Sequence, residues 1–305
     1  MNLRLDIHLV AAALFGSVLA CGGGGGGFKD PGHQASAEQA TKLSGIGDSI
    51  MQGMDTACDG STPTLEDHTA CSFAQGNGGD IFSLYWRYKV IAGLAGGEEF
   101  VSVSGSTMMD DAYPQATQIC AQSTKPNRIV ILLGGNDVCI QSDVTSLPTA
   151  KAFGDALTGA LSKLASVDCG LPSGIRVHVL SMPRINHLFS ATSGKSCHSF
   201  LEILCPIVTG TNQQRQEVQD RIDAYNGAIS DTVAAANSAY HHADDDILFS
   251  TDWNGTSNPS IGTHVFVSSD ISDVDCFHPS AQGQNMLACA AWESWEGLGN
   301  ASNCP

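Results

Sequence analysis

The chain alternates short apolar segments with stretches that have the residue spacing of helices. The clearest segment is 128–133 (RIVILL), a short continuous apolar run of the kind found in buried strands of parallel sheets. Other short segments predict further strands at residues 43–47, 100–103, 175–181, 247–250 and 264–267. Strands that alternate with helices along one chain indicate an α/β sandwich with a mostly parallel sheet.

Four stretches carry apolar side chains at helical spacing, and they cover residues 81–94, 153–164, 218–233 and 279–295. The chain has no internal repeat and no second linker, so we expect one domain over residues 42–305. The long connection 183–212 contains Cys197, Cys205 and an apolar stretch at 200–208. It is interpreted as either a lid or a surface insertion.

The first 20 residues have the features of an export signal. Arg4 precedes the apolar run 9–20, which ends in small residues and is too short to span a bilayer. Val-Leu-Ala-Cys at residues 18–21 resembles a bacterial lipobox, in which the cysteine is lipidated and becomes the mature N-terminus. Six glycines follow Cys21, and a glycine-rich stretch acts as a flexible tether.

These features predict a signal peptide at residues 1–20 and a lipidated Cys21 with its tether at residues 21–41. The lipid would anchor the protein to the outer membrane or cell surface. Ordinary secretion or release into the periplasm, with Cys21 unmodified, is the alternative.

Ten cysteines remain after Cys21, and an even number in an exported chain suggests up to five disulfides. The spacing favours the pairs 58/71, 197/205 and 289/304, although spacing does not fix connectivity. The chain has no CxxC pair, which makes a zinc ribbon or thioredoxin-like redox chemistry a poor fit.

The charge balance is strongly acidic, with 14 Lys and Arg against 31 Asp and Glu and a net charge of −17. Phosphate backbones would be repelled, so nucleic acid is excluded as a partner. Hydrophobic residues make up 42% of the chain, enough for a real core. We expect a monomer that needs no cofactor and no metal ion.

Reactive residues follow several of the predicted strands, where open α/β sheets bind their ligands. Ser49 follows the first strand, Gly105 the segment 100–103, and Asn136 the segment 128–133. Asp275 and His278 directly precede the last predicted helix.

These residue types supply the parts of a serine hydrolase. A serine becomes a nucleophile when a histidine takes its proton, and a carboxylate holds that histidine in the correct tautomer. Ser49, His278 and Asp275 provide this triad. The backbone N–H groups of Ser49 and Gly105 and the side-chain amide of Asn136 form the expected oxyanion hole.

Two aspartates beside these residues are assigned structural roles. Asp48 is expected to organise the turn that carries Ser49, and Asp137 is interpreted as structural rather than as a second orienting carboxylate. The turn is predicted to lead from a strand into a helix, whose N-terminus would favour developing negative charge near Ser49.

The motifs GDSI at residue 47, the isolated Gly105, GGND at residue 134 and DCFHPS at residue 275 occur in this order. Together they resemble the SGNH (GDSL-type) hydrolase family over about residues 43–292, in particular its exported bacterial esterases and lipases. The resemblance implies a flavodoxin-like three-layer α/β/α sandwich with a five-stranded parallel sheet. It also implies carboxylic ester hydrolysis through an acyl-enzyme, with the residue roles given above.

Several alternatives stay open at this point. The same machinery serves esterases, lipases, phospholipases and carbohydrate O-acetyl esterases, and the apolar stretch 200–208 leans toward acyl-lipid substrates. A catalytically inactive surface-binding protein would keep the same fold. The acidic cluster Asp244–Asp246 leaves room for a metal-dependent hydrolase. A histidine base predicts that activity falls below about pH 6.

Overall fold

The computed structural model describes residues 40–296, except for residues 59, 61, 78, 241–246 and 254–260. The predicted signal peptide, Cys21 and its tether up to residue 39, the cluster Asp244–Asp246 and Cys304 lie outside the described residues. No helix within the described ranges has both the length and the apolar character needed to cross a membrane.

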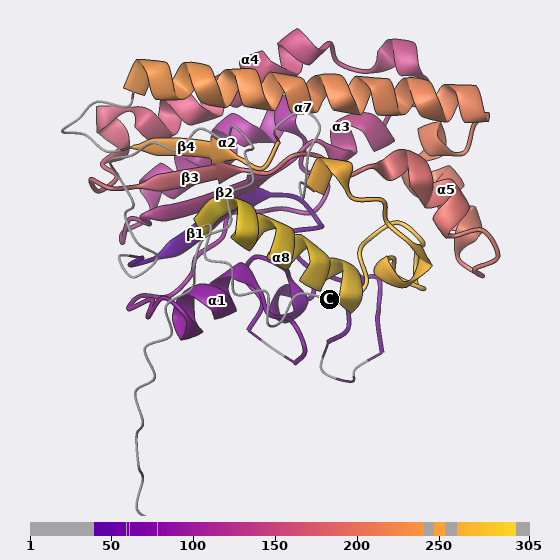
Figure 1. Cartoon of the computed structure of the whole chain (residues 1–305), viewed down its shortest axis with the longest axis horizontal. Coiled ribbons are helices and arrows are strands. Elements are labelled where there is room, and N and C mark those ends of the chain that lie inside the picture. The colour runs from indigo at the N-terminus through magenta and orange to yellow at the C-terminus, as the bar shows by residue number, and fades with distance from the viewer. Residues whose placement is uncertain are drawn as a thin grey trace, which may run out of the picture. The chain divides into compact units, whose positions relative to one another are not determined.

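The centre of the domain is a parallel sheet, which has four strands within the described ranges (Figure 1). Its order is β1 (Leu43–Gly47), β2 (Arg128–Leu132), β3 (Arg176–Val179) and β4 (Leu248–Thr251). Every residue of β1 and β2 is buried, and β2 accordingly reads as a continuous apolar run in the sequence. All four strands lie where the sequence predicts them.

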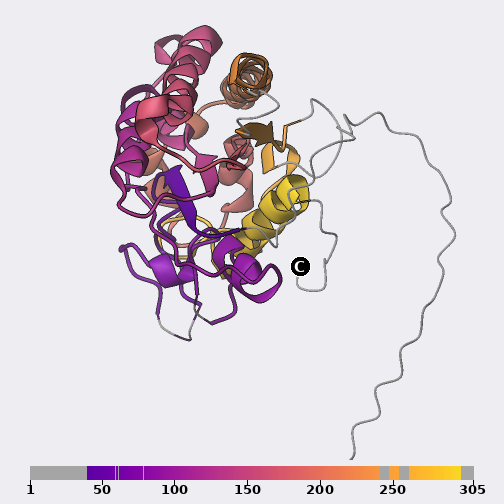
Figure 2. The same cartoon turned by 90° about the vertical axis from the view of Figure 1, so that its left-hand side faces the viewer.

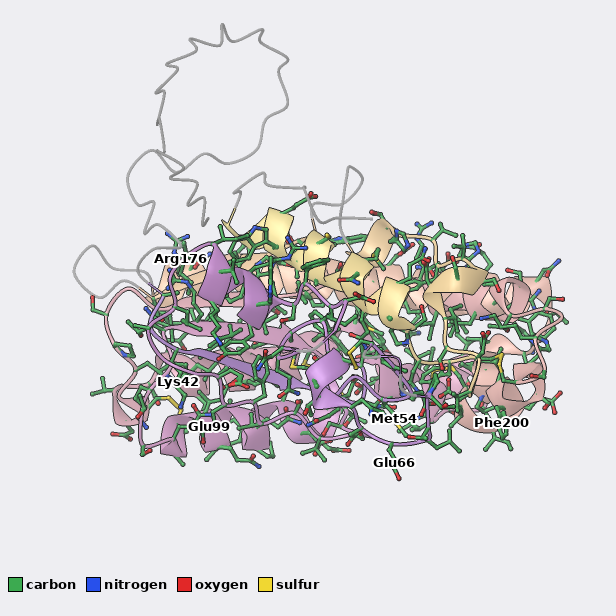
Figure 3. All side chains as sticks on the ribbon, turned by 90° about the horizontal axis from the view of Figure 1, so that it is seen from below. Lys42, Met54, Glu66, Glu99, Arg176 and Phe200 are labelled. Atoms are coloured by element: carbon green, nitrogen blue, oxygen red, sulfur yellow. A yellow bond between two sulfur atoms is a disulfide. The ribbon has the colours of Figure 1, made fainter. Side chains whose placement is uncertain are left out.

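The segment 97–103 takes the position of the predicted fifth strand without regular strand geometry. The N–H groups of Glu99, Val101 and Val103 each donate to a carbonyl oxygen of β1 at 3.1 Å. The ion pair of Lys42 with Glu99 at 2.5 Å ties the start of β1 to the same segment (Figure 3). Counting this segment, the order along the sheet is that of flavodoxin-like folds, so the predicted fold class is confirmed.

The strand predicted at residues 264–267 is wrong. These residues are irregular and connect two 3-10 turns, Ile261–Thr263 and Ser268–Asp270. Phe266 is buried, whereas Val265 and Val267 are 44% and 52% exposed. The apolar side chains of this segment therefore include one ring packed on the domain, without a paired strand.

Helices cover both faces of the sheet and complete three layers (Figure 1). On one face lie α2 (Met108–Ala121), α4 (Ala150–Ala165) and α7 (Asn212–Tyr240), and Figure 2 looks along α7. On the other face lie α1 (Leu84–Val90) and α8 (Ala281–Glu296).

Aromatic rings join the helices within each layer. Phe153 of α4 stacks on Tyr225 of α7 with ring centroids 4.3 Å apart. On the opposite face, Tyr88 of α1 meets Trp292 of α8 edge to face at 5.0 Å. Such ring pairs add about 0.5–1.5 kcal/mol beyond the burial of their surface.

The remaining helices are short. They are α3 (Gly135–Cys139), α5 (Leu188–Ala191) and α6 (Leu201–Leu204), with 3-10 turns at Thr69–Cys71, Val144–Ser146, Val167–Cys169, Ile185–His187, His198–Phe200 and Pro206–Val208. The connection 183–212 is thus a series of short helical turns rather than an irregular loop.

Four disulfides join cysteines of the described residues: Cys58–Cys71, Cys120–Cys169, Cys139–Cys205 and Cys197–Cys276. The predicted pair 58/71 is confirmed. The predicted pair 197/205 is wrong, because the turns of the connection direct the two sulfurs to different parts of the domain. The pair 289/304 involves Cys304, which lies outside the described residues.

Removal of Cys120–Cys169 by a double Cys→Ala substitution should destabilise the domain. The bond joins residues 49 positions apart, so its loss increases the chain entropy of the unfolded state. This should lower the free energy of unfolding by up to ~4 kcal/mol. Urea unfolding under non-oxidising conditions measures the difference from the wild type. An unchanged midpoint would show that the pair is not formed.

Candidate active site

Ser49 lies two residues beyond the end of β1, at the carboxyl edge of the sheet. The carboxylate of Asp48 accepts the backbone N–H of Ile50 at 2.9 Å, so Asp48 organises the turn as predicted. The helix predicted after Ser49 is wrong, because residues 49–55 form successive turns instead. Ser49 is therefore not followed by a helix N-terminus.

His278 and Asp275 lie on the segment 270–280, named here the histidine loop. Ile271 bridges Pro279 in antiparallel fashion, and the N–H of Ser272 donates to the carbonyl of His278 at 2.8 Å. One oxygen of the Asp275 carboxylate accepts the backbone N–H groups of Phe277 and His278 at 2.9 and 3.0 Å. The loop therefore fixes Asp275 and His278 relative to each other.

The structure brings Ser49, His278 and Asp275 into one hydrogen-bonded series. His278 Nε2 lies 2.8 Å from Ser49 Oγ, and His278 Nδ1 lies 2.5 Å from Asp275 Oδ2. All three residues are at most 5% exposed. Burial raises the pKa of Asp275, but the hydrogen bond and charge of His278 outweigh burial and bring this pKa down to about 2. Asp275 is thus a carboxylate at neutral pH.

Gly105 and Asn136 contribute donors at the same edge of the sheet. Gly105 has φ +87°, a left-handed conformation that favours glycine, and a Cβ placed there would meet no protein atom within 4 Å. The N–H groups of Ser49 and Gly105 donate to no residue that the structure describes. The Asn136 amide donates one hydrogen to the carbonyl of Ser106 at 2.9 Å and retains a second.

Asp137 connects two of these segments, which agrees with its predicted structural role. Its two carboxylate oxygens accept the backbone N–H groups of Met108 and Met109, at 2.6 and 3.1 Å, at the start of α2. Burial, the largest influence, raises the pKa of Asp137 to about 6. The bonds hold the Gly105 turn against the segment that carries Asn136.

Gln115 is a supporting residue that the sequence analysis did not identify. Its side chain accepts the N–H of Gly47 at 2.8 Å and donates to the carbonyl of Gly47 at 3.0 Å. It also donates to the hydroxyl of Ser106 at 2.9 Å. One buried amide on α2 thus joins the residue before the Ser49 turn to the residue after Gly105.

An apolar hollow of about 30 Å³ adjoins these residues. Three of its lining residues, Ile50, Gly135 and Phe277, are chain neighbours of Ser49, Asn136 and His278. Ile185 and Leu188, from the connection 183–212, line it as well.

Asp55, Asp275 and His278 place three potential metal ligands within 4.8 Å of one another. Both ring nitrogens of His278 already lie within hydrogen-bond distance of Ser49 and Asp275. The contacts of His278 within the protein therefore already use both of its ring nitrogens.

A serine, a histidine and a carboxylate hydrogen-bonded in series, on an α/β fold, are the arrangement of serine hydrolases. A sequence profile of the GDSL-like lipase/acylhydrolase family matches residues 46–286, and the chain belongs to this family. The resemblance inferred from the motifs is thereby confirmed.

Solved structures with a similar fold include three enzymes of different stated substrate. A family 3 carbohydrate esterase from Clostridium thermocellum is 14% identical, with 84% of this chain and 94% of that chain covered and a TM-score of 0.46. An extracellular lipase from Streptomyces rimosus is 19% identical, with 83% and 100% covered and a TM-score of 0.44. A phospholipase A1 from Streptomyces albidoflavus is 18% identical, with 80% and 94% covered and a TM-score of 0.43. None of the curated proteins compared with this sequence matches it.

The disulfide Cys197–Cys276 should matter for turnover as well as for stability. Cys276 has φ +61°, and the disulfide holds this left-handed residue between Asp275 and Phe277. A Cys197→Ala/Cys276→Ala variant should relax the loop and lower kcat for ester hydrolysis at least ~10-fold with little change in KM.

The matched control is the Cys120→Ala/Cys169→Ala variant, assayed well below the unfolding temperatures of both. It should lose stability and keep its kcat, because neither cysteine contacts the histidine loop. Equal kcat in the two variants would contradict the role assigned to Cys197–Cys276.

Asp48 should make stability depend on pH. Burial raises the pKa of Asp48 to about 7, so the folded state retains a proton that the unfolded state releases from about pH 4 upward. Stability therefore falls as the pH rises toward 7. The free energy of unfolding of Asp48→Asn minus that of the wild type should rise by about 2 kcal/mol from pH 5 to pH 7.5. Urea unfolding at the two pH values measures this difference. A constant difference would contradict this assignment.

Proposed function

We propose that this protein hydrolyses carboxylic esters through an acyl-enzyme formed on Ser49. The proposal rests on the 2.8 Å contact of Ser49 with His278 and the 2.5 Å contact of His278 with Asp275, within a chain of the lipase/acylhydrolase family. An inactive binding protein would have no need of this buried, fully connected series.

In the first half-reaction His278 Nε2 takes the proton of Ser49 Oγ as the oxygen attacks the ester carbonyl. Asp275 stabilises the imidazolium that forms and keeps Nδ1 protonated. The N–H groups of Ser49 and Gly105 and the second amide hydrogen of Asn136 receive the negative charge on the carbonyl oxygen. Collapse of the tetrahedral intermediate releases the alcohol, which takes the proton from His278.

In the second half-reaction water replaces the alcohol. His278 takes a proton from the water as its oxygen attacks the acyl carbon, and the same donors receive the oxyanion. The acid leaves and Ser49 regains its proton. The chain's own residues supply each proton transfer in this sequence.

We propose further that the acyl group is short. The apolar hollow lined by the chain neighbours Ile50, Gly135 and Phe277 measures about 30 Å³, which suits a small acyl group. The apolar stretch 200–208 does not enlarge it: Leu201, Ile207 and Val208 are buried in the core. Phe200 and Ile203 of this stretch are exposed, and Figure 3 shows Phe200 at the margin of the domain. The structure thus favours short acyl esters over the acyl-lipid substrates suggested by the sequence.

The proposal includes export and anchoring. Four disulfides among the described residues suit an oxidising compartment. We propose that residues 1–20 direct export, that Cys21 carries the lipid, and that residues 21–41 tether the catalytic domain 42–305.

Hydrolysis of p-nitrophenyl esters from acetate to palmitate tests the function and the acyl preference together. Acetate and butyrate should exceed laurate and palmitate in kcat/KM by at least ~10-fold, because longer chains do not fit the hollow. Palmitate as the best substrate would contradict the short-acyl proposal while leaving the triad intact.

Ser49→Ala should lower kcat by about 10⁴-fold or more, because the nucleophile is lost. The exposed Ser199→Ala variant is the matched control and should retain wild-type rates. A fluorophosphonate probe should label the wild type and not Ser49→Ala. Absence of labelling in the wild type would contradict an activated serine at this position.

A further inference from the structure

Asp55 is a buried carboxyl directly behind the triad, and the steps proposed above do not use it. It is 1% exposed, and its Oδ2 lies 3.8 Å from His278 Nδ1, the nitrogen that faces Asp275. Its carboxyl lies within 4.8 Å of both Asp275 and His278. The two carboxyls thus lie beside one imidazole.

Neither carboxylate oxygen of Asp55 accepts a hydrogen bond from any described residue. A buried carboxylate without donors is costly, so a carboxyl in this position is expected to be neutral. A neutral carboxyl has one O–H to donate, and the Asp275 carboxylate lies within 4.8 Å of it as an acceptor.

The backbone of Asp55 is tied to the histidine loop. Its carbonyl accepts the hydroxyl of Ser272 at 3.0 Å, and the hydroxyl of the next residue, Thr56, donates to the carbonyl of Pro279 at 2.9 Å. Its N–H donates to the carbonyl of Glu66 at 3.1 Å; Figure 3 labels Glu66 beside Met54, the residue before Asp55. These bonds hold φ at +59°, a conformation that aspartate and asparagine tolerate better than other side chains.

We propose, on the basis of the ester hydrolysis proposed above, that Asp55 is a positioning residue. Its carboxyl group keeps its proton and donates a hydrogen bond to the carboxylate of Asp275. The bond keeps the carboxylate of Asp275 directed at His278 Nδ1 and limits the pair of carboxyls to a single negative charge. The strained backbone and the otherwise unpartnered carboxyl both follow from this role.

The charges around Asp55 agree with a retained proton. Burial is the largest influence, and the neighbouring Asp275 carboxylate adds to it, raising the pKa of Asp55 to about 8. Asp67 contributes further negative charge in the same direction. Lys195 and Asp273 line the same hollow as Asp55 and form an ion pair with each other at 2.7 Å.

The role predicts an alkaline limit to catalysis. Above about pH 8 the proton of Asp55 is lost, and a second buried carboxylate then faces the imidazole. Two adjacent buried carboxylates repel each other, which displaces Asp275 from His278 Nδ1. Activity should therefore fall toward high pH in a way that depends on Asp55.

The experiment measures kcat and KM from pH 6 to pH 9.5 with a short-chain ester for the wild type, Asp55→Asn, Asp55→Ala and Asp67→Asn. Asp55→Asn keeps an N–H donor toward Asp275 and suits φ +59°, so its kcat at pH 7 should lie within ~3-fold of the wild type. Its kcat should stay level to pH 9.5, whereas that of the wild type falls about 10-fold. Asp55→Ala should lose at least ~10-fold in kcat at pH 7 with KM unchanged.

Asp67→Asn is the matched control, since it removes a nearby exposed charge and leaves the Asp55–Asp275 pair intact. Its alkaline limb should keep the depth of the wild-type limb and begin at a slightly lower pH, because loss of the Asp67 charge lowers the pKa of Asp55 a little. The proposal is overturned if Asp55→Asn shows the same alkaline limb as the wild type, or if Asp55→Ala keeps its kcat in a folded protein.

A readout that does not depend on esters separates this inference from the proposed function. The ¹³C carboxyl resonance that is missing from Asp55→Asn should titrate near pH 8 in the wild type. Titration near pH 4 would overturn the role of Asp55 even in an active esterase. Titration near pH 8 in a protein that neither hydrolyses esters nor reacts with fluorophosphonate would refute the proposed function and support the proton on Asp55.

Discussion

The contact between His278 Nε2 and Ser49 Oγ joins residues that are 229 positions apart. The fold holds these two atoms 2.8 Å from each other. The serine is carried by a turn at the end of a fully buried central strand. The histidine is carried by a loop that precedes a helix on one face of the sheet. The turn and the loop are far apart in the sequence, so contacts between distant segments must set the distance between them. Gln115, Asp137 and the disulfide at Cys276 each fix one part of this arrangement.

The regular elements could be predicted where burial alone determines the pattern. Strand β2 is buried at every position, and the sequence therefore marks it as a continuous apolar run. Helix α2 was not predicted, because Pro114 lies inside it and two aspartates occupy its first turn. Its start did carry a signal, since Thr107 accepts the N–H of Asp110 at 3.1 Å as an N-cap. Ordered sequence motifs identified the triad residues, which the fold then brings together.

Pairings between distant segments could not be read from the sequence. Cys197 and Cys205 are eight positions apart and would close a short loop, yet each joins a remote segment of the domain. Asp55 lies in no recognisable sequence motif. Ser272, whose hydroxyl donates to the carbonyl of Asp55, is 217 positions away in the sequence. The helical N-terminus expected behind Ser49 is absent because turns continue from Ser49 to Asp55. These turns end at Asp55, whose carboxyl lies within 4.8 Å of Asp275 and His278.

The bond between Cys197 and Cys276 has a consequence for the cell that makes the protein. A newly synthesised chain in a reducing cytoplasm would carry both sulfurs as thiols, and its histidine loop would lack this tie. With export as proposed above, oxidation outside the cytoplasm would then complete the loop that presents His278 to Ser49. The protein would in this way reach full activity only after leaving the cytoplasm, and esters inside the producing cell would be spared from hydrolysis.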